Sequence, residues 1–358
     1  MLVLRRLAPA AAVALALGAS RAAAQAPPTP AADSQRIALQ AAQLDSLAST
    51  AQVSGVVLLA QGPTPVLQRT YGLADRAAKR PNTIDTRFNL GSISKVFTAT
   101  AIRQLAEQGK LGLDDPLVRH LPDYPNADVA RRVTIRQLLE HRSGIGGNIF
   151  DAPPGRTRAD LRRNRDFLQL FAAQPLQFEP GTGQRYSNAG YVVLGAVIER
   201  VSGASYYDYV REHIFRPAGM TATDSYAKDS LPPNTALGYA RDAPGESTQG
   251  PLRPNFDLLP GRGSAAGGGY STAPDLLRFA LAMQAGRIAG APRQAMGIGG
   301  GAPGINALLE AGMPGGYTLV ILANLDPPAA EALGRAVGGW LGIADDEGGR
   351  VMRAGPPH

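Results

Sequence analysis

The chain has 358 residues, of which 44% are hydrophobic and 18% charged, a composition that is typical of a folded globular protein and excludes a disordered chain. Its net charge of +7 comes almost wholly from scattered arginines, without the basic runs or interleaved aromatic residues of a nucleic-acid-binding face. Cysteine is absent, which excludes disulfides, thiol chemistry and a lipidated cysteine.

The N-terminal segment, residues 1–26, is predicted to be a signal peptide. Arginines precede an apolar stretch, "LAPAAAVALALGA", that is too short to span a bilayer comfortably. Small residues follow, and cleavage is expected after Ala24 or Ala26. An uncleaved N-terminal anchor is the alternative. We therefore expect a periplasmic or secreted protein with no stable membrane span after cleavage, which begins with a flexible leader over 27–34.

Strand signals lie at both ends of the mature chain. After an amphipathic helix over 34–50, the Val- and Leu-rich stretches 54–62 and 65–75 predict a hairpin. Residues 305–326 predict two strands joined by a glycine-rich turn, and 327–342 a closing helix with proline in its first turn. The simplest fold is α+β, a three-layer αβα arrangement in which both termini build one antiparallel sheet flanked by the terminal helices.

The middle of the chain has mostly helical signals. Helices are expected from Ser92 to Lys110 and over 134–144, 188–203 and 273–286, each stopped at or beside a glycine. We expect an all-helical insertion and a ligand site where it meets the sheet. The predicted division is one domain over 35–345, with a sheet part at about 35–90 and 290–345, a helical part at about 91–289, and a C-terminal tail at 346–358.

The stretch "GSISKVFTATAI" contains a serine followed three residues later by one of the few lysines. One helical turn separates Ser92 from Lys95, so their side chains share a face. A helix N-terminus favours developing negative charge, and a buried lysine with a lowered pKa serves as a base. This arrangement suits an activated serine nucleophile. The alternative is a serine cap followed by an exposed lysine.

Two further segments contain residues suited to the same chemistry. In "FEPGTGQRYSNAGYVVLG", Tyr186 could relay protons and Asn188 could hold a substrate carbonyl, although packing or capping is the ordinary role of such residues. In "MGIGGGAPGIN", the glycines beside a strand permit close backbone approach by a ligand. A backbone N–H there could complete an oxyanion hole with that of Ser92, and a flexible turn is the alternative.

Taken together and in this order, the three motifs resemble those of the serine beta-lactamase and penicillin-recognising enzyme family, specifically its class C-like branch. The resemblance covers roughly residues 35–342. The stretches that carry it are "RFNLGSISKVFTATAIRQLAEQGKLGLDDPLVRHLP", "VTIRQLLEHRSGI", "FEPGTGQRYSNAGYVVLGAVIERVSG" and "GGGYSTAPDLLRFA". It implies the beta-lactamase/DD-peptidase fold, a mixed sheet-and-helix architecture with an all-helical subdomain.

The resemblance also implies a role for each motif. Ser92 corresponds to the nucleophile that forms an acyl-enzyme, Lys95 to the residue that activates it, and Tyr186 to the phenolic acid/base. Asn188 corresponds to the residue that orients the substrate carbonyl. The backbone of the Gly300-Gly301 pair would bind substrate, with the Gly301 N–H in the oxyanion hole. His141, in "LLEHRSG", corresponds to a structural position, and we expect no triad base there.

One position departs from the family pattern. The third motif of the family opens with Lys or His, and the aligned residue here is Ile298, in "GIGGGAPG". A cation there would steady Tyr186 and a substrate carboxylate, and isoleucine does neither. Carboxylate-bearing substrates such as beta-lactams and D-Ala-D-Ala peptides are therefore disfavoured. Arg262 and Arg293 are the candidates for a replacement charge.

The resulting prediction is an exported serine hydrolase that acts through a Ser92 acyl-enzyme on a small-molecule or peptide ester or amide. It is expected to be esterase-like, peptidase-like or a weak beta-lactamase. The rival is a catalytically weakened homologue that binds peptidoglycan fragments or a protein partner. No metal or organic cofactor is expected, because the histidines show no ligand spacing and cysteine is absent. The oligomeric state is left open.

Overall fold

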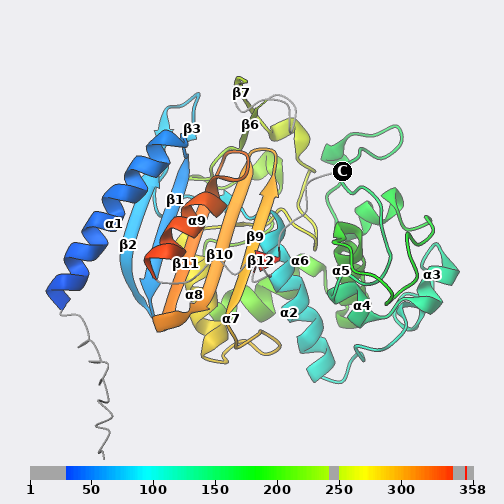
Figure 1. The fold of residues 1–358 in the computed structure, drawn as a ribbon. Helices are drawn as coiled ribbons and strands as arrows, with labels where there is room; N and C mark the ends of the chain where they lie inside the picture. The colour runs from blue at the N-terminus through cyan, green and yellow to red at the C-terminus, as the bar shows by residue number, and fades with distance from the viewer. Residues whose placement is uncertain (1–29, 242–249, 342–350, 353–358) are drawn as a thin grey trace, which may run out of the picture.

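The computed structural model describes residues 30–241, 250–341 and 351–352. A six-stranded sheet forms its centre, and helices cover both faces of this sheet (Figure 1). The expected signal peptide, 1–26, and most of the expected tail, 346–358, lie outside the described residues. Within the described part, no helix is long and apolar enough to cross a membrane.

The central sheet joins the two ends of the chain, as the strand signals predict. Its strands are β1 Gly55–Gln61, β2 Thr64–Tyr71, β9 Met296–Ala302, β10 Ile305–Met313, β11 Tyr317–Ala323 and β12 Val351–Met352. They lie in the order β12-β9-β10-β11-β1-β2. β1 pairs antiparallel with β11, so that Gly55 lies opposite Ala323, and the short β12 pairs parallel with β9. The N-terminal hairpin and the C-terminal strands therefore share one sheet.

Helices cover the two faces of the sheet because successive residues of a strand point to opposite sides. On one side, Val57 belongs to a buried cluster with α1 (Pro30–Thr50) and α9 (Ala329–Trp340). On the other, Val56 belongs to the larger core with α8 (Ala273–Gln284). Figure 1 shows α1 and α9 lying across the same face of the strands. The three layers of the predicted αβα arrangement are present.

The first helix starts earlier than its periodicity predicts. α1 begins at Pro30, so residues 30–34, which we expected in the flexible leader, are helical. Proline is tolerated in a first helical turn because its missing N–H would have no partner within the helix, and the alanines that follow favour helix. The boundary at 34 is therefore wrong by one turn.

The part between the two halves of the sheet is mainly helical. Its helices are α2 Ser94–Glu107, α3 Ala127–Arg132, α4 Ile135–Leu139, α5 Asn188–Ser202, α6 Tyr206–Val210, α7 Arg216–Ala218 and α8, with a π-helical turn at Arg211–Phe215. Short 3₁₀ turns lie at Gly91–Ile93, Leu117–Arg119, Arg158–Asp160, Asn164–Leu170, Lys228–Ser230 and Phe256–Leu258, and one more lies in the sheet at Pro314–Gly316.

Short strands also occur in the part that we expected to be wholly helical. β6 pairs with β7, and β8 pairs with β5, which directly precedes the Ser92 turn. These pairings give the backbone groups of long loops hydrogen-bond partners that the helices do not supply. Of the short strands, β6 Tyr239–Arg241, β7 Leu252–Pro254 and β8 Tyr270–Ser271 lie in this part, whereas β3 Leu73–Asp75, β4 Arg80–Pro81 and β5 Phe88–Asn89 precede it.

Candidate active site

Ser92 lies in the tight turn that leads into α2. Gly91, just before it, has a φ of +50°, which glycine adopts without strain, and its N–H donates to Asn89 Oδ1 at 2.9 Å. One helical turn later, Lys95 Nζ lies within hydrogen-bond distance of Ser92 Oγ, at 3.0 Å. The structure therefore brings together the serine and the lysine of the first motif.

Lys95 is almost wholly removed from water, with 3% of its surface exposed. Its amine also donates to Asn188 Oδ1 at 2.8 Å and to the carbonyl oxygen of Ala266. Burial holds the pKa of Lys95 well below its ordinary value, because the charged form loses its hydration. The alternative of an exposed lysine is wrong. A buried amine whose pKa is lowered is able to take the proton of a neighbouring hydroxyl.

Tyr186 approaches Ser92 from the other side. Its hydroxyl lies 2.6 Å from Ser92 Oγ, and Lys95 Nζ lies 4.8 Å from the centre of its ring. Burial raises the pKa of Tyr186, and the hydrogen bond to Ser92 opposes this only in part, so the phenol is neutral. The side chain of Ser187 caps α5 by accepting from the Gly190 N–H at 2.9 Å. This cap fixes the start of the helix that carries Asn188.

His141 supports Tyr186 from behind. We expected one helix from Thr134 to Gly144, but α4 ends at Leu139 and His141 takes a φ of +58°. Its ring lies 4.7 Å from that of Tyr186, and its Nδ1 accepts from a backbone N–H. Burial lowers the pKa of His141 to about 4, so the ring is neutral. These contacts agree with the structural position that the resemblance implies.

The glycine-rich strand β9 runs directly against the Ser92 turn. A Cβ atom on Gly300 would lie 2.9 Å from the Ser92 nitrogen and 2.1 Å from the carbonyl oxygen of Leu90. A Cβ atom on Gly91 would lie 3.2 Å from the nitrogen of Gly301. The backbones therefore meet more closely than side chains allow, and the glycines of the third motif lie in an ordered strand rather than in a flexible turn.

Ile298 belongs to the hydrophobic core. It lies two residues before Gly300 and hence on the same face of β9, and only 4% of its surface is exposed. The guanidinium of Arg293 packs against Gly286, just after α8, where an added Cβ atom would lie 2.7 Å from it. The position that opens the third motif is thus apolar in the structure as well as in the sequence.

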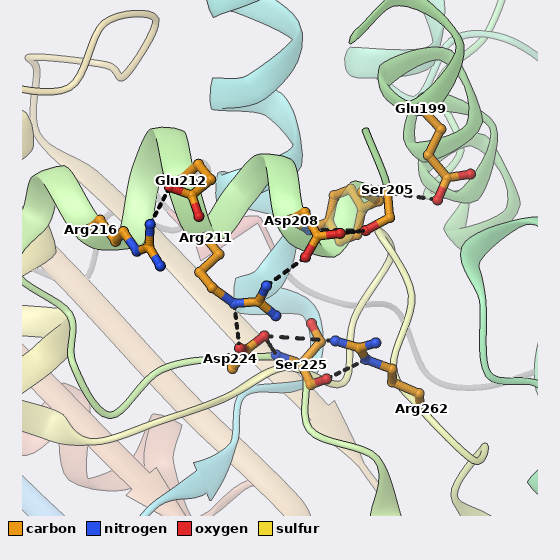
Figure 2. Close-up of polar contacts among 10 residues, drawn as sticks. Glu199, Ser205, Asp208, Arg211, Glu212, Arg216, Asp224, Ser225 and Arg262 are labelled. Atoms are coloured by element: carbon orange, nitrogen blue, oxygen red, sulfur yellow. Dashed lines mark hydrogen bonds and ion pairs between the residues drawn. The ribbon is translucent and has the colours of Figure 1, made fainter. Parts of the chain in front are cut away.

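Arg262, the other candidate for a replacement charge, is engaged elsewhere. Its Nε donates to the Ser225 carbonyl, and its guanidinium lies 3.9 Å from Asp224 and 3.7 Å from the centre of the Tyr207 ring. Figure 2 shows Arg262 directed at Asp224 and Ser225, with Arg211 reaching the same carboxylate from the helix above. This network ties loop 261–269 to the helices.

Loop 261–269, "GRGSAAGGG", is a part of the site that sequence reasoning missed. Its Ala266 carbonyl accepts from Lys95, and its Gly269 N–H donates to Ser94 Oγ at 3.2 Å. A Cβ atom on Gly267 would lie 3.0 Å from the Gly91 carbonyl oxygen. The only signal in the sequence was a run of small residues, which permits close backbone packing and names no partner.

Known proteins resemble this chain over most of its length. A family model described as Beta-lactamase matches residues 39–342. The putative penicillin-binding protein PbpX of Bacillus subtilis (strain 168) is 34% identical over 235 residues, which are 66% of this chain and 56% of the relative. Esterase EstB of Burkholderia gladioli is 34% identical over 264 residues, which are 65% of this chain and 66% of the relative.

The fold has close counterparts among solved structures. A penicillin binding protein from Bacillus halodurans superposes with a TM-score of 0.73 at 31% identity, over 83% of this chain and 98% of that one. The matches to the first curated penicillin-binding relatives span only 45%, 56% and 61% of their lengths. The family model nevertheless covers every strand of the sheet except β12, the helical part and every residue of the site. The chain belongs to the beta-lactamase family.

Proposed function

We propose that the protein is an exported serine hydrolase that forms an acyl-enzyme on Ser92 with an ester or amide. One observation carries the proposal: Ser92 Oγ lies 3.0 Å from the buried amine of Lys95 and 2.6 Å from the hydroxyl of Tyr186. A serine held between an amine whose pKa is lowered and a neutral phenol has both a proton acceptor and a route by which the proton can move on.

The reaction then follows from the positions of these groups. As Ser92 Oγ bonds to the substrate carbonyl carbon, its proton passes to Lys95, and the backbone N–H groups of Ser92 and Gly301 hold the resulting oxyanion. Breaking the bond to the leaving group restores the carbonyl. The proton travels from Lys95 through Tyr186 to the leaving oxygen or nitrogen, and water later releases the acyl group by the reverse proton path.

The substrate class follows from the apolar residue in the third motif. Ile298 supplies no charge, and Arg262 is committed to Asp224 and the Ser225 carbonyl. A substrate carboxylate would therefore find a cationic partner in neither of these two residues. We propose that neutral esters are preferred over penicillins and cephalosporins, because a neutral ester has no carboxylate that needs a cationic partner. The similarity to a relative named as an esterase supports this preference.

The experiment is intact-protein mass spectrometry after exposure to a nitrophenyl ester, a fluorophosphonate and a penicillin. We expect one ester-derived or phosphonyl adduct per chain, on Ser92, and little penicillin adduct. Ser92→Ala should take up no label, whereas Ser94→Ala, a matched change in the same turn, should still be labelled on Ser92. A parent inert to every probe would contradict the hydrolase and favour a homologue that binds peptidoglycan fragments or a protein partner.

A further inference from the structure

The carbonyl that Lys95 meets lies in a loop with little side-chain packing of its own. Within loop 261–269, residues 263–269 are all Gly, Ala or Ser. Glycine- and alanine-rich backbone has many accessible conformations, so hydrogen bonds must hold it in one of them. The backbone N–H and the backbone carbonyl of Ala265 both have such partners, and these partners come from two different helical segments.

On one side, Thr98 holds the Ala265 carbonyl. Thr98 lies on α2, one turn after Lys95, and is fully buried. Its Oγ1 donates to the Ala265 carbonyl oxygen at 2.7 Å and lies 2.9 Å from the hydroxyl of Tyr206. Because a hydroxyl has one proton, Thr98 accepts from Tyr206 and donates to Ala265. The direction of this buried chain is therefore determined.

On the other side, Asn164 holds the Ala265 N–H. Its Oδ1 accepts from the Ala265 nitrogen at 3.1 Å, and its Nδ2 donates to the Val192 carbonyl of α5 at 2.8 Å. Asn164 is fully buried. A Cβ atom on Gly195 would lie 2.5 Å from Ala265 Cβ and 2.6 Å from the Asn164 amide, so α5 needs a glycine there to admit both groups.

We propose that Thr98 and Asn164 are positioning residues. Their hydrogen bonds fix the backbone N–H and carbonyl of Ala265, an arrangement we call the clamp, and so keep the next carbonyl, that of Ala266, within hydrogen-bond distance of the Lys95 amine. The proposal rests on the proposed function, in which Lys95 accepts the proton of Ser92. Neither residue touches the reacting atoms in this assignment, and both act through the loop backbone.

The physical reason lies in the charge that Lys95 acquires during the reaction. The amine becomes an ammonium with three N–H donors, and a buried ammonium is costly unless each donor has an acceptor. Ser92 Oγ, Asn188 Oδ1 and the Ala266 carbonyl are the three acceptors within reach. An acceptor fixed beforehand stabilises the charge without reorganisation. A loosened Ala266 carbonyl would make Lys95 a weaker base.

Lys95 is the group whose titration reports this effect. The Tyr186 and Tyr191 rings lie 4.8 and 5.6 Å from its Nζ, and burial raises the pKa of both phenols. The pKa of His141 is about 4. Arg262, the charged residue of loop 261–269, is directed at Asp224 and Ser225 (Figure 2). The acidic limb of the pH profile, in which the labelling rate falls as the pH is lowered, is therefore assigned to Lys95 rather than to His141 or the phenols.

The test measures the rate of fluorophosphonate labelling of Ser92 against pH, together with the melting temperature. Thr98→Val keeps the volume of the side chain and removes its hydroxyl, and Thr98→Ser restores the hydroxyl. Thr98→Ala serves as a second variant if the valine protein does not fold. Thr100→Val is the matched control, because Thr100 is also fully buried on α2 and its hydroxyl has no partner among the described residues.

We expect Thr98→Val to lower the plateau rate about tenfold, the effect of weakening one charge-assisted hydrogen bond, and to move the acidic limb to lower pH. Thr98→Ser should recover both, and Thr100→Val should change neither. An unshifted limb in both the valine and alanine variants, or an equal loss in Thr100→Val, would overturn the proposal. A parent whose Ser92 is not labelled would instead overturn the proposed function, and the clamp with it.

Discussion

Replacing Lys95 by methionine removes the base of the proposed reaction while keeping the length and apolar stem of the side chain. In the parent, Lys95 Nζ lies 3.0 Å from Ser92 Oγ and donates to Asn188 Oδ1 at 2.8 Å and to the Ala266 carbonyl. Methionine donates to none of them. Ser92 would keep its contact with Tyr186, but burial raises the pKa of this phenol, so it already carries its own proton at neutral pH and is a poor acceptor of the serine proton.

The expected loss of acylation rate follows from the role of a general base, which contributes about 10²- to 10⁴-fold. The effect on folding is smaller, because two changes oppose each other. Asn188 Oδ1 and the Ala266 carbonyl lose a donor, which costs about 1–3 kcal/mol for each buried group. The variant in turn no longer buries an amine, whose desolvation destabilises the folded parent. We expect the free energy of unfolding at pH 7 to change by about 2 kcal/mol or less.

The pH dependence of stability separates these two changes. The folded pKa of Lys95 lies below its unfolded value of about 10.4, so the unfolded chain binds more protons between the two values. Parent stability should therefore rise with pH in that window, by up to about 1.4 kcal/mol per pH unit, and this rise should be absent in Lys95→Met.

The assay combines stopped-flow acylation by a nitrophenyl ester with denaturant unfolding at several pH values. Lys95→Met acylated at the parent rate would refute the assignment of the base. Identical pH dependence of unfolding in parent and variant would refute a lowered lysine pKa. A slow variant that unfolds near the parent's midpoint is the expected result.

Further substitutions test the other groups of the site. Tyr186→Phe should slow hydrolysis of alkyl esters about 10²-fold and nitrophenyl esters much less, because nitrophenolate leaves without a proton; equal losses on both substrates would contradict the proton relay. Ile298→His should raise turnover of a chromogenic cephalosporin about ten- to a hundred-fold, the value of one charge-assisted contact, and a parent that already hydrolyses it efficiently would show that another residue supplies the charge. Gly300→Ala should abolish labelling and lower the melting temperature, since its Cβ would lie 2.1 Å from the Leu90 carbonyl oxygen. In Gly301→Ala, the new Cβ atom would lie 3.0 Å from its nearest neighbour, a proline ring carbon, so this variant should lose less stability than Gly300→Ala. A larger loss of stability in Gly301→Ala would contradict the placement of β9.

The sequence by itself was enough for the features that depend on neighbouring residues. One helical turn between Ser92 and Lys95 places their side chains on one face wherever the helix lies. The Val- and Leu-rich strand patterns of the two termini predicted a shared sheet, because strands this apolar must be buried and neither end has enough of them to form a stable sheet alone. Helix α5 could likewise be located between its polar start and Gly203, which takes the left-handed conformation that ends it.

Tertiary structure alone decided the features that depend on backbone atoms or on distant partners. Every residue has a backbone carbonyl, so the sequence does not mark the one at Ala266 as a partner of Lys95. A run of small residues does not indicate which side chain it will contact. The left-handed turn at His141, just after the end of α4, places its ring against a tyrosine that is remote in the chain. Local patterns report periodicity, whereas these contacts arise only when separate elements pack and each buried polar group must find a partner.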